Sequence, residues 1–333
     1  LFVFNARLHG PLFMASDLNG WQVGPDRFSR IEATDLHYLY RELPYDCRLR
    51  YKLVTDGSWF ADPFGCWVEP DGMPVPMFRT GTFNSVLDTG APGSARGDSL
   101  IAVRFNSVLR GHTRDVWISL PRTYSAQHAA GYPVLYVNDG NEALTRVHLH
   151  ATARAMMDRG EVQPAILVFV GLADPMERNY EYTDLVGRDA YAGFLARELA
   201  PFIDSSFRTR AEPRGRAVMG ASFGAISAWY TGWRYPDVFG CVAGQGTSFF
   251  VHDWDVLQRY VDAPRHRLRL YMDSATPSHK GGLRDSVFSA RHAQKVLREA
   301  GYRVRHVVRT DQEHDWPSWA ERFPEILREF WPA

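Results

Sequence analysis

The sequence AVMGASFGA at residues 217–225 joins a short apolar segment to the pattern Gly-x-Ser-x-Gly. Residues 226–230, ISAWY, follow it with a pattern typical of a helix. A strand, a sharp turn with Ser222 at its apex and a helix together predict a nucleophile elbow. Gly220 and Gly224 support this prediction, because such a turn closes only around small residues. The alternative is an ordinary strand-to-helix turn that happens to contain a serine.

The elbow predicts a nucleophile and, with it, a fold. A strained turn lifts the Ser222 hydroxyl clear of the sheet, and the free N–H groups at the start of the following helix point toward it. This arrangement is typical of α/β-hydrolases, in which the acid and then the histidine follow the serine along the chain.

The general base is expected among the histidines that follow the elbow. These are His252, His266, His279, His292, His306 and His314. His292 falls in a predicted helix, and His306 falls in the predicted strand 303–308, RVRHVV. His314 follows this last strand in the segment DQEHDW, residues 311–316. Because a base in that loop can reach the serine across the edge of the sheet, we expect His314 to be the base and not a surface histidine.

The acid that orients the imidazole belongs in the loop after the preceding strand, residues 267–272. Two aspartates are eligible, since Asp273 closes that strand and Asp285 opens the following helix. We prefer Asp285, because a carboxylate on the strand tends to lie too deep in the sheet, and Asp273 remains the alternative. Each also has an ordinary explanation, Asp285 as a helix cap and Asp273 as a turn former.

Two backbone N–H groups are needed to stabilise the oxyanion that forms during acyl transfer. One is expected from Phe223, directly after the nucleophile. The other is expected from the loop after the buried strand 133–138, PVLYVN. Asn141 is the candidate donor in that loop, and Gly140 gives the backbone the freedom to present it. Asp-Gly is also a common plain turn, so this loop carries little weight by itself.

Composition limits the remaining function classes. The chain has 333 residues, 45% of them hydrophobic, which is enough for two domains with full cores. Its 38 basic residues balance 38 acidic ones, so the charge predicts neither a nucleic-acid nor an anionic membrane partner. No apolar run approaches the roughly 18 residues that span a bilayer. The expected partner is a small-molecule ester, and the oligomeric state is left open.

The cysteines and the first residue give further expectations. Cys47, Cys66 and Cys241 lack metal-binding spacing, so we expect neither a metal nor another cofactor, and a Cys47–Cys66 disulfide is left open. No signal peptide is visible, which favours a cytoplasmic location. Because the sequence begins with Leu1 and not with Met, we also expect residues to precede it in the natural protein.

Turn signals divide the chain near residue 90. Before it, short alternating segments such as 37–43 and 49–54 predict a small β-sandwich without helices. Residues 89–97, TGAPGSARG, have the composition of a linker. Beyond it, strands are expected near residues 100–108, 114–120, 134–138, 165–171, 214–220, 239–244, 267–273 and 303–310. Helices separate all but the first two, which predicts an α/β fold with a largely parallel sheet covered on both faces.

These motifs resemble one family over nearly the whole chain: the enterochelin (ferric siderophore) esterases and, more widely, the D-type esterases, which include feruloyl esterases and mycolyltransferases. The matching segments of the hydrolase are VLYVNDG at 134–140, RNYEY at 178–182, GASFG at 220–224 and HDW at 314–316. SDLNGW at 16–21 and YKLVTDG at 51–57 resemble the immunoglobulin-like (early-set) domain that precedes the hydrolase in this family. The resemblance implies an immunoglobulin-like domain at 1–90 and an α/β-hydrolase esterase domain at 98–333.

The resemblance also implies the reaction, that of a metal-free serine carboxylesterase acting on a small soluble ester. A siderophore trilactone is one candidate, and a feruloyl or acetyl ester of plant polysaccharide is the alternative. Ala225 and Glu313 stand where the family usually has glycine, which weakens the link to a siderophore. Trp21 and Trp59 of the first domain can stack on sugar rings or belong to its core. A binding protein on a hydrolase fold is the alternative outside enzymes.

Substrate contacts are expected from the loops above the nucleophile. The candidates are Asp139, Arg178, Tyr182 and Trp316. Arg178 can pair with an anionic or catecholate group, although an Arg178–Glu181 ion pair that holds its loop is an equal alternative. Trp316 and its neighbour Trp319 can stack on an aromatic acyl group, or they can pack the last helix.

Overall fold

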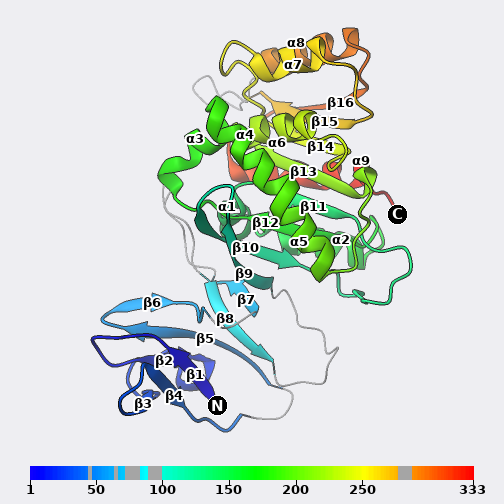
Figure 1. Cartoon of the computed structure of the whole chain (residues 1–333). Coiled ribbons are helices and arrows are strands. Elements are labelled where there is room, and N and C mark those ends of the chain that lie inside the picture. Colours follow the sequence, from blue (N-terminus) through cyan, green and yellow to red (C-terminus); the bar gives the residue numbers. More distant parts are fainter. Residues whose placement is uncertain (44–46, 64–66, 72–82, 89–99, 277–286) are drawn as a thin grey trace. The chain divides into compact units, whose positions relative to one another are not determined.

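The computed structural model describes residues 1–43, 47–63, 67–71, 83–88, 100–276 and 287–333. They form two compact units, Leu1–Val103 and Arg104–Ala333 (Figure 1). The boundary lies inside strand β9 (Leu100–Ser107), later than the division near residue 90 that the sequence predicts. Pairing explains the difference, because Leu100 at the start of β9 pairs with Val68 of the first unit. The predicted linker at 89–97 lies outside the described residues.

The first unit is built of short antiparallel strands. One sheet contains β1 (Phe2–Asn5), β4 (Leu36–Leu39) and β3 (Ser29–Arg30). The other strands are β2 (Phe13–Ser16), β5 (Arg48–Thr55), β6 (Ser58–Phe60), β7 (Trp67–Pro70) and β8 (Phe83–Asp88). Among the described residues of this unit, the helical content is one 3₁₀ turn at Asp17–Asn19. The unit is therefore an all-β structure, as its alternating segments predict.

The core of the first unit comes from the inward-facing residues of these strands. Its buried members are Phe2, Phe4, Leu12, Met14, Phe28, Leu39, Leu49, Tyr51 and Leu53. Trp59 lies outside the core with 43% of its surface exposed. Trp21 is half-buried, and its indole N–H donates to Asp17 Oδ1 over 3.1 Å. The alternative that these two tryptophans belong to the core is therefore wrong.

The second unit is an α/β structure around one sheet. Its strands lie in the order β16-β15-β14-β13-β11-β12-β10-β9. Their bounds are β10 (His112–Ser119), β11 (Val134–Val137), β12 (Ile166–Val170), β13 (Arg216–Ala221), β14 (Cys241–Gln245), β15 (Arg269–Ala275) and β16 (Val304–Arg309). All neighbours from β12 to β16 pair in parallel, whereas β10 runs antiparallel to β12. This is the largely parallel sheet that the sequence predicts.

Helices cover both faces of this sheet (Figure 1). They are α1 (Gly140–Thr145), α2 (Leu149–Asp158), α3 (Arg178–Tyr182), α4 (Leu185–Phe194), α5 (Ala200–Ser206), α6 (Phe223–Arg234), α7 (Asp255–Asp262), α8 (Val287–Glu299) and α9 (Trp316–Phe330). Helix α6 packs with α3, α4 and α7, while α2 packs with α9. The strands β11 to β14 are buried along their whole length, which explains their continuous apolar runs. None of the helices in the described part of the chain combines the length and the hydrophobicity that crossing a membrane requires.

The strand order places two loops together at one edge of the sheet. Strand β11 lies between β12 and β13. After β11 the chain therefore forms β12 on one side of it and then crosses over to form β13 on the other side. Such a reversal opens a crevice at the carboxyl ends of the two adjacent strands, where ligands bind in α/β folds. The loop at residues 138–141 follows β11, and Ser222 follows β13. Both segments predicted to supply the oxyanion donors therefore lie at the carboxyl ends of the adjacent strands β11 and β13.

Candidate active site

Ser222 lies at a strained turn between β13 and α6. Its backbone has φ 55° and ψ −117°, a conformation that costs free energy for any residue with a side chain. The Ser222 N–H is fixed by a 2.9 Å hydrogen bond to the carbonyl oxygen of Gln245 on β14. A β-carbon on Gly220 would lie 2.2 Å from the carbonyl oxygen of Gly224. Glycine at position 220 is thus required by close approach of two backbones across the turn.

His314 reaches the serine from the loop between β16 and α9. Its Nε2 lies 2.9 Å from Ser222 Oγ, although the two residues are 92 positions apart in the sequence. The Trp319 ring packs edge-on against the imidazole, with the ring centroids 4.9 Å apart. His292 and His306 lie in α8 and β16, as the sequence predicts, and neither forms this contact. The structure therefore brings together the serine and the histidine that the sequence pairs.

Asp273, the alternative acid, is engaged elsewhere. It is fully buried, and β15 continues past it to Ala275. Arg322 Nε donates to its Oδ1 over 2.9 Å, and Gln245 Nε2 donates to its Oδ2 over 3.0 Å. These contacts make Asp273 half of a buried ion pair between β15 and α9. Asp285 lies outside the described residues, so its role as the acid stays a prediction.

The loop after β11 combines a left-handed residue with a close backbone contact. Asp139 has φ 54° and ψ 45°, while Gly140 begins α1. A β-carbon on Gly140 would lie 2.7 Å from the backbone of Phe169 and Val170 on β12. Glycine is therefore needed here for space, and Asp139 carries the unusual conformation instead. The N–H groups of Phe223 and Asn141 have no acceptor among the described residues, as expected for the first turn of a helix.

Arg178 and Asp139 form a two-point ion pair beside the elbow. Arg178 Nε and one of its terminal nitrogens each donate to Asp139 carboxylate oxygens over 2.7 Å. Burial alone would lower the pKa of Arg178, but Asp139 outweighs it and the pKa is raised. The alternative Arg178–Glu181 pair is wrong, because Glu181 pairs with Arg110 and Arg114.

The burial of these residues corrects one expectation about substrate contacts. Asp139 is 1% exposed and Tyr182 is fully buried, with its hydroxyl accepting the Asp139 N–H over 3.0 Å. Both side chains hold the loop in place and present no surface to a ligand. Arg178 keeps 29% of its side chain exposed and remains a candidate. Trp316 is half-buried against Trp319, with the ring centroids 5.4 Å apart, and Trp319 is buried in the packing of α9.

Glu142 adds a second carboxylate close to this loop. Burial raises its pKa to about 7, and repulsion from Asp139 contributes in the same direction. Its Oε2 has no hydrogen-bond partner among the described residues. The region next to Asn141 therefore carries a carboxyl group that titrates near neutral pH.

Comparison with known proteins identifies the family. Residues 107–330 match the sequence model of a family described as putative esterase. The chain belongs to this esterase family. It is accordingly an ester hydrolase. All the matched residues lie in the second unit, and they include the elbow and the loop that carries His314.

Two relatives of this esterase are themselves esterases of different kinds. The iron(III) enterobactin esterase of Dickeya dadantii is 25% identical over 291 residues, which cover 74% of this chain and 63% of that protein. The endo-1,4-β-xylanase/feruloyl esterase of Xylanibacter ruminicola is 23% identical over 287 residues, which cover 81% of this chain and 36% of that protein. The esterase thus spans less than two thirds of the length of these two relatives.

A solved structure supports the fold. The enterobactin esterase of Shigella flexneri, crystallised in the presence of enterobactin, superposes with a TM-score of 0.60. The superposition covers 99% of this esterase and 91% of that chain at 16% sequence identity. At this identity the likeness establishes the shared fold and leaves the substrate open.

One cluster of the esterase has the donor atoms of a metal site. His112, Glu177 and Glu181 place a ligating atom each within 4.8 Å of one another. Arg110 and Arg114 donate to Glu181, however, and their guanidinium groups already neutralise its carboxylate. The two guanidinium groups beside the buried Glu181 carboxylate would repel a metal ion. These contacts are therefore better suited to holding α3 in place.

The structure also shows a second serine–histidine contact that the sequence does not suggest. Ser274 Oγ lies 2.8 Å from His306 Nε2, but Ser274 is 1% exposed. Burial lowers the pKa of His306 to about 4, with Arg291 and Arg298 adding to the shift. Because Ser274 is buried, this pair is closed to substrate. It can therefore be compared with the half-buried pair at the elbow.

Proposed function

We propose that this esterase is a serine carboxylesterase with Ser222 as nucleophile, His314 as general base and Asp285 as orienting acid. The observation that carries the proposal is the 2.9 Å contact between Ser222 Oγ and His314 Nε2 at a strained elbow. Such a contact allows the imidazole to take the hydroxyl proton as the oxygen attacks. An acid hydrogen-bonded to Nδ1 would keep Nε2 unprotonated and facing the serine.

The reaction then proceeds in two halves. In the first, Ser222 Oγ adds to the ester carbonyl carbon while His314 Nε2 takes its proton. The bond to the leaving oxygen breaks, and His314 returns the proton to that oxygen, so that an alcohol departs and an acyl-serine remains. In the second, His314 activates a water molecule in the same way, and the acid product leaves.

The oxyanion of each tetrahedral intermediate needs donors fixed in advance. We assign this role to the backbone N–H groups of Phe223 and Asn141, which have no acceptor among the described residues. Each such donor contributes roughly 3 kcal/mol to the lowering of the barrier. The left-handed Asp139, clamped by Arg178, supports a loop conformation that is held ready before substrate binds.

The proposed substrate is a small soluble ester, with a siderophore trilactone first and a feruloyl or acetyl ester of plant polysaccharide second. The enterobactin and feruloyl esterases among the relatives support these two classes. Arg178 is the proposed contact for an anionic or catecholate group. Because its charge is already paired with Asp139, it would act as a hydrogen-bond donor more than as a net positive charge.

We also propose that residues 1–90 form an immunoglobulin-like (early-set) domain, which the all-β structure of the first unit supports. Such a domain can wall the active site or bind a glycan. The exposed Trp59 favours the second role, since an aromatic face on the surface can stack on a sugar ring. If the wild type binds soluble xylan and Trp59→Ala does not, the result would support glycan binding by this residue. Equal binding of xylan by the wild type and Trp59→Ala would exclude it.

Labelling by a fluorophosphonate probe and hydrolysis of p-nitrophenyl acetate test the reaction. The wild type should be labelled and active, whereas Ser222→Ala should lose both properties. Ser274→Ala is the matched control, because it removes the hydroxyl of the buried serine–histidine pair and should leave both signals intact. Full activity of Ser222→Ala would rule the mechanism out.

A panel of substrates tests the ranking of ester classes. It compares ferric and iron-free catecholate trilactones, feruloylated oligosaccharides, and nitrophenyl esters under the same conditions. Hydrolysis of the trilactones with the highest kcat/KM is expected. Turnover of feruloylated sugars without trilactone hydrolysis would reverse the ranking, and activity on nitrophenyl esters alone would make the protein a general carboxylesterase.

A further inference from the structure

Asn138 connects the two loops that carry the proposed oxyanion donors. It follows β11 directly, is fully buried, and its N–H donates to the Met219 carbonyl of β13 over 2.9 Å. Its side-chain Nδ2 donates to the carbonyl oxygen of Gly224, in the first turn of α6, over 2.8 Å. Its Oδ1 accepts from the Tyr191 hydroxyl on α4 over 2.9 Å. One side chain thus reaches from the β11 loop to the start of the nucleophile helix.

The partners dictate which way the Asn138 amide points. A carbonyl oxygen such as that of Gly224 can only accept, so the nitrogen of the amide must face it. The amide oxygen must then face Tyr191, whose hydroxyl can donate. Neither aspartate nor leucine at position 138 could form both hydrogen bonds. An ionised aspartate cannot donate, and leucine can neither donate nor accept. Burial makes an unmatched group here costly.

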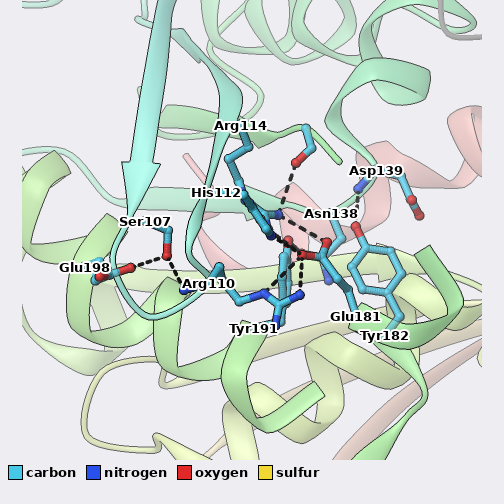
Figure 2. A network of polar contacts seen from close by, with 11 residues as sticks. Ser107, Arg110, His112, Arg114, Asn138, Asp139, Glu181, Tyr182, Tyr191 and Glu198 are labelled. Carbon is cyan, nitrogen blue, oxygen red and sulfur yellow. Dashed lines mark hydrogen bonds and ion pairs between the residues drawn. The ribbon is translucent and has the colours of Figure 1, made fainter. Parts of the chain in front are cut away.

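A parallel contact holds the next residue of the loop. The Asp139 N–H donates to the Tyr182 hydroxyl over 3.0 Å, and the Tyr182 and Tyr191 rings pack edge-to-face with centroids 5.2 Å apart. Tyr182 lies on α3 next to Glu181, which Arg110 and Arg114 fix from the β9–β10 side (Figure 2). The two tyrosines therefore rest on a buried ion-pair network and cannot easily shift.

We propose that Asn138 is a positioning residue that holds the N–H groups of Phe223 and Asn141 in mutual register, with Tyr191 fixing its amide. The inference rests on the proposed function, since it concerns the oxyanion site of that reaction. Asn138 does not touch the substrate. It acts on Phe223 through the first turn of α6, and on Asn141 through the loop that it begins. Misplacing a catalytic group by about 1 Å can cost about 100-fold in rate, so small movements at this link matter.

Tyr191→Phe is the main test variant, because it removes only the hydroxyl that orients Asn138. We expect kcat for p-nitrophenyl acetate to fall about 10-fold while KM changes less than about 2-fold, since donors to the oxyanion act in the transition state. Asn138→Ala removes the whole link, and its kcat should fall about 100-fold. Tyr230→Phe is the matched control, because its hydroxyl donates to Asp189 and has no bond to Asn138; its kcat should equal that of the wild type.

Affinity for phenylboronic acid separates positioning from a merely structural role. The boronate adds to the serine and mimics the tetrahedral oxyanion, so its Ki should rise in Tyr191→Phe by the factor by which kcat/KM falls. Unchanged kcat and unchanged Ki in Tyr191→Phe would overturn the inference, and so would a loss of kcat with unchanged Ki. A wild type without esterase activity would instead overturn the proposed function, so the two failures can be told apart.

Discussion

Two carboxylates close to the elbow differ in how their charge is compensated. Asp273 and Arg322 are both fully buried and bind each other, with Gln245 donating a further hydrogen bond to the carboxylate. Glu142 is only partly buried, yet its Oε2 lacks a partner among the described residues. A buried pair becomes costly when one member is removed, whereas a carboxylate in apolar surroundings resists ionisation. These environments give two predictions at the scale of single residues.

Replacing each candidate acid should have a different consequence. Asp273→Asn should lower the free energy of unfolding by about 3–5 kcal/mol, because Arg322 keeps a buried charge without its counter-ion. Asp285→Asn should instead lower kcat by about 10⁴, because the imidazole loses the acid that selects its tautomer. Urea unfolding and p-nitrophenyl acetate kinetics on both variants measure these effects. The double variant Asp273→Asn with Arg322→Met should recover stability, and a reversed pattern would assign the acid role to Asp273.

Glu142 should make stability depend on pH. Its pKa in the folded protein, about 7, lies above the ordinary value of 4.5, so folding favours the protonated form. That contribution is fully present below about pH 4.5 and is lost as the pH rises to about 7. Glu142→Gln should therefore raise Tm at pH 8 and change it little at pH 4.5. Glu299→Gln, which alters an exposed carboxylate on α8, is the control. An equal effect of Glu142→Gln at both pH values would contradict this.

At the scale of elements, the elbow depends on how closely β13 approaches α6. The strand ends at Ala221 and the helix begins at Phe223, so Ser222 alone makes the turn. The turn leaves no room for a side chain at position 220, because backbone atoms of Gly224 and Ala225 lie within 2.8 Å of the place that a Cβ would take. A flexible side chain could move away from an added methyl group, but backbone held by both a strand and a helix cannot.

Gly220→Ala should therefore damage the protein, whereas a second glycine-to-alanine change should not. The new methyl group would meet the Gly224 carbonyl, and we expect a loss of about 1–3 kcal/mol in stability together with a loss of activity. Gly193 lies within α4, and a β-carbon there would meet ordinary contacts of 3.4 and 3.7 Å. In Gly193→Ala the free energy of unfolding should stay the same or rise by up to about 1 kcal/mol, because alanine favours the helix. Thermal unfolding of the two variants checks both expectations. Equal stability of Gly220→Ala and the wild type would show that the turn can relax.

At the scale of the whole molecule, charge is balanced. The 38 basic and 38 acidic residues give no net charge at pH 7, and the isoelectric point is about 7.3. Proteins without net charge repel one another least, so association is easiest at that pH. We expect a solubility minimum close to pH 7.3, with higher solubility at pH 6 and pH 9. Turbidity of a concentrated sample across this range measures it, and a minimum more than one pH unit away would contradict the expectation.

The sequence by itself determined the features that depend on local pattern. The Gly-x-Ser-x-Gly motif between an apolar run and a helix sufficed to place Ser222 at a turn. The periodicity of the second unit predicted every strand from β9 to β16, with each boundary within two residues of the observed one. Chain order singled out His314, because an α/β sheet collects its loops at the carboxyl ends of its strands. These inferences succeed because short-range backbone geometry limits which residues can occupy strands, turns and helix starts.

Only the tertiary structure decided which charged and polar groups meet. The sequence offers the nearby Glu181 as one possible partner of Arg178, yet Arg178 binds Asp139, 39 positions away, and Glu181 binds Arg114, 67 positions away. It offers Tyr182 to the substrate, yet the fold buries that ring completely. The link from Asn138 to Gly224 likewise joins residues 86 positions apart. Side-chain partners depend on the packing of elements that are distant in the chain. A buried polar group takes whichever partner that packing brings within hydrogen-bonding distance, and no local pattern specifies it.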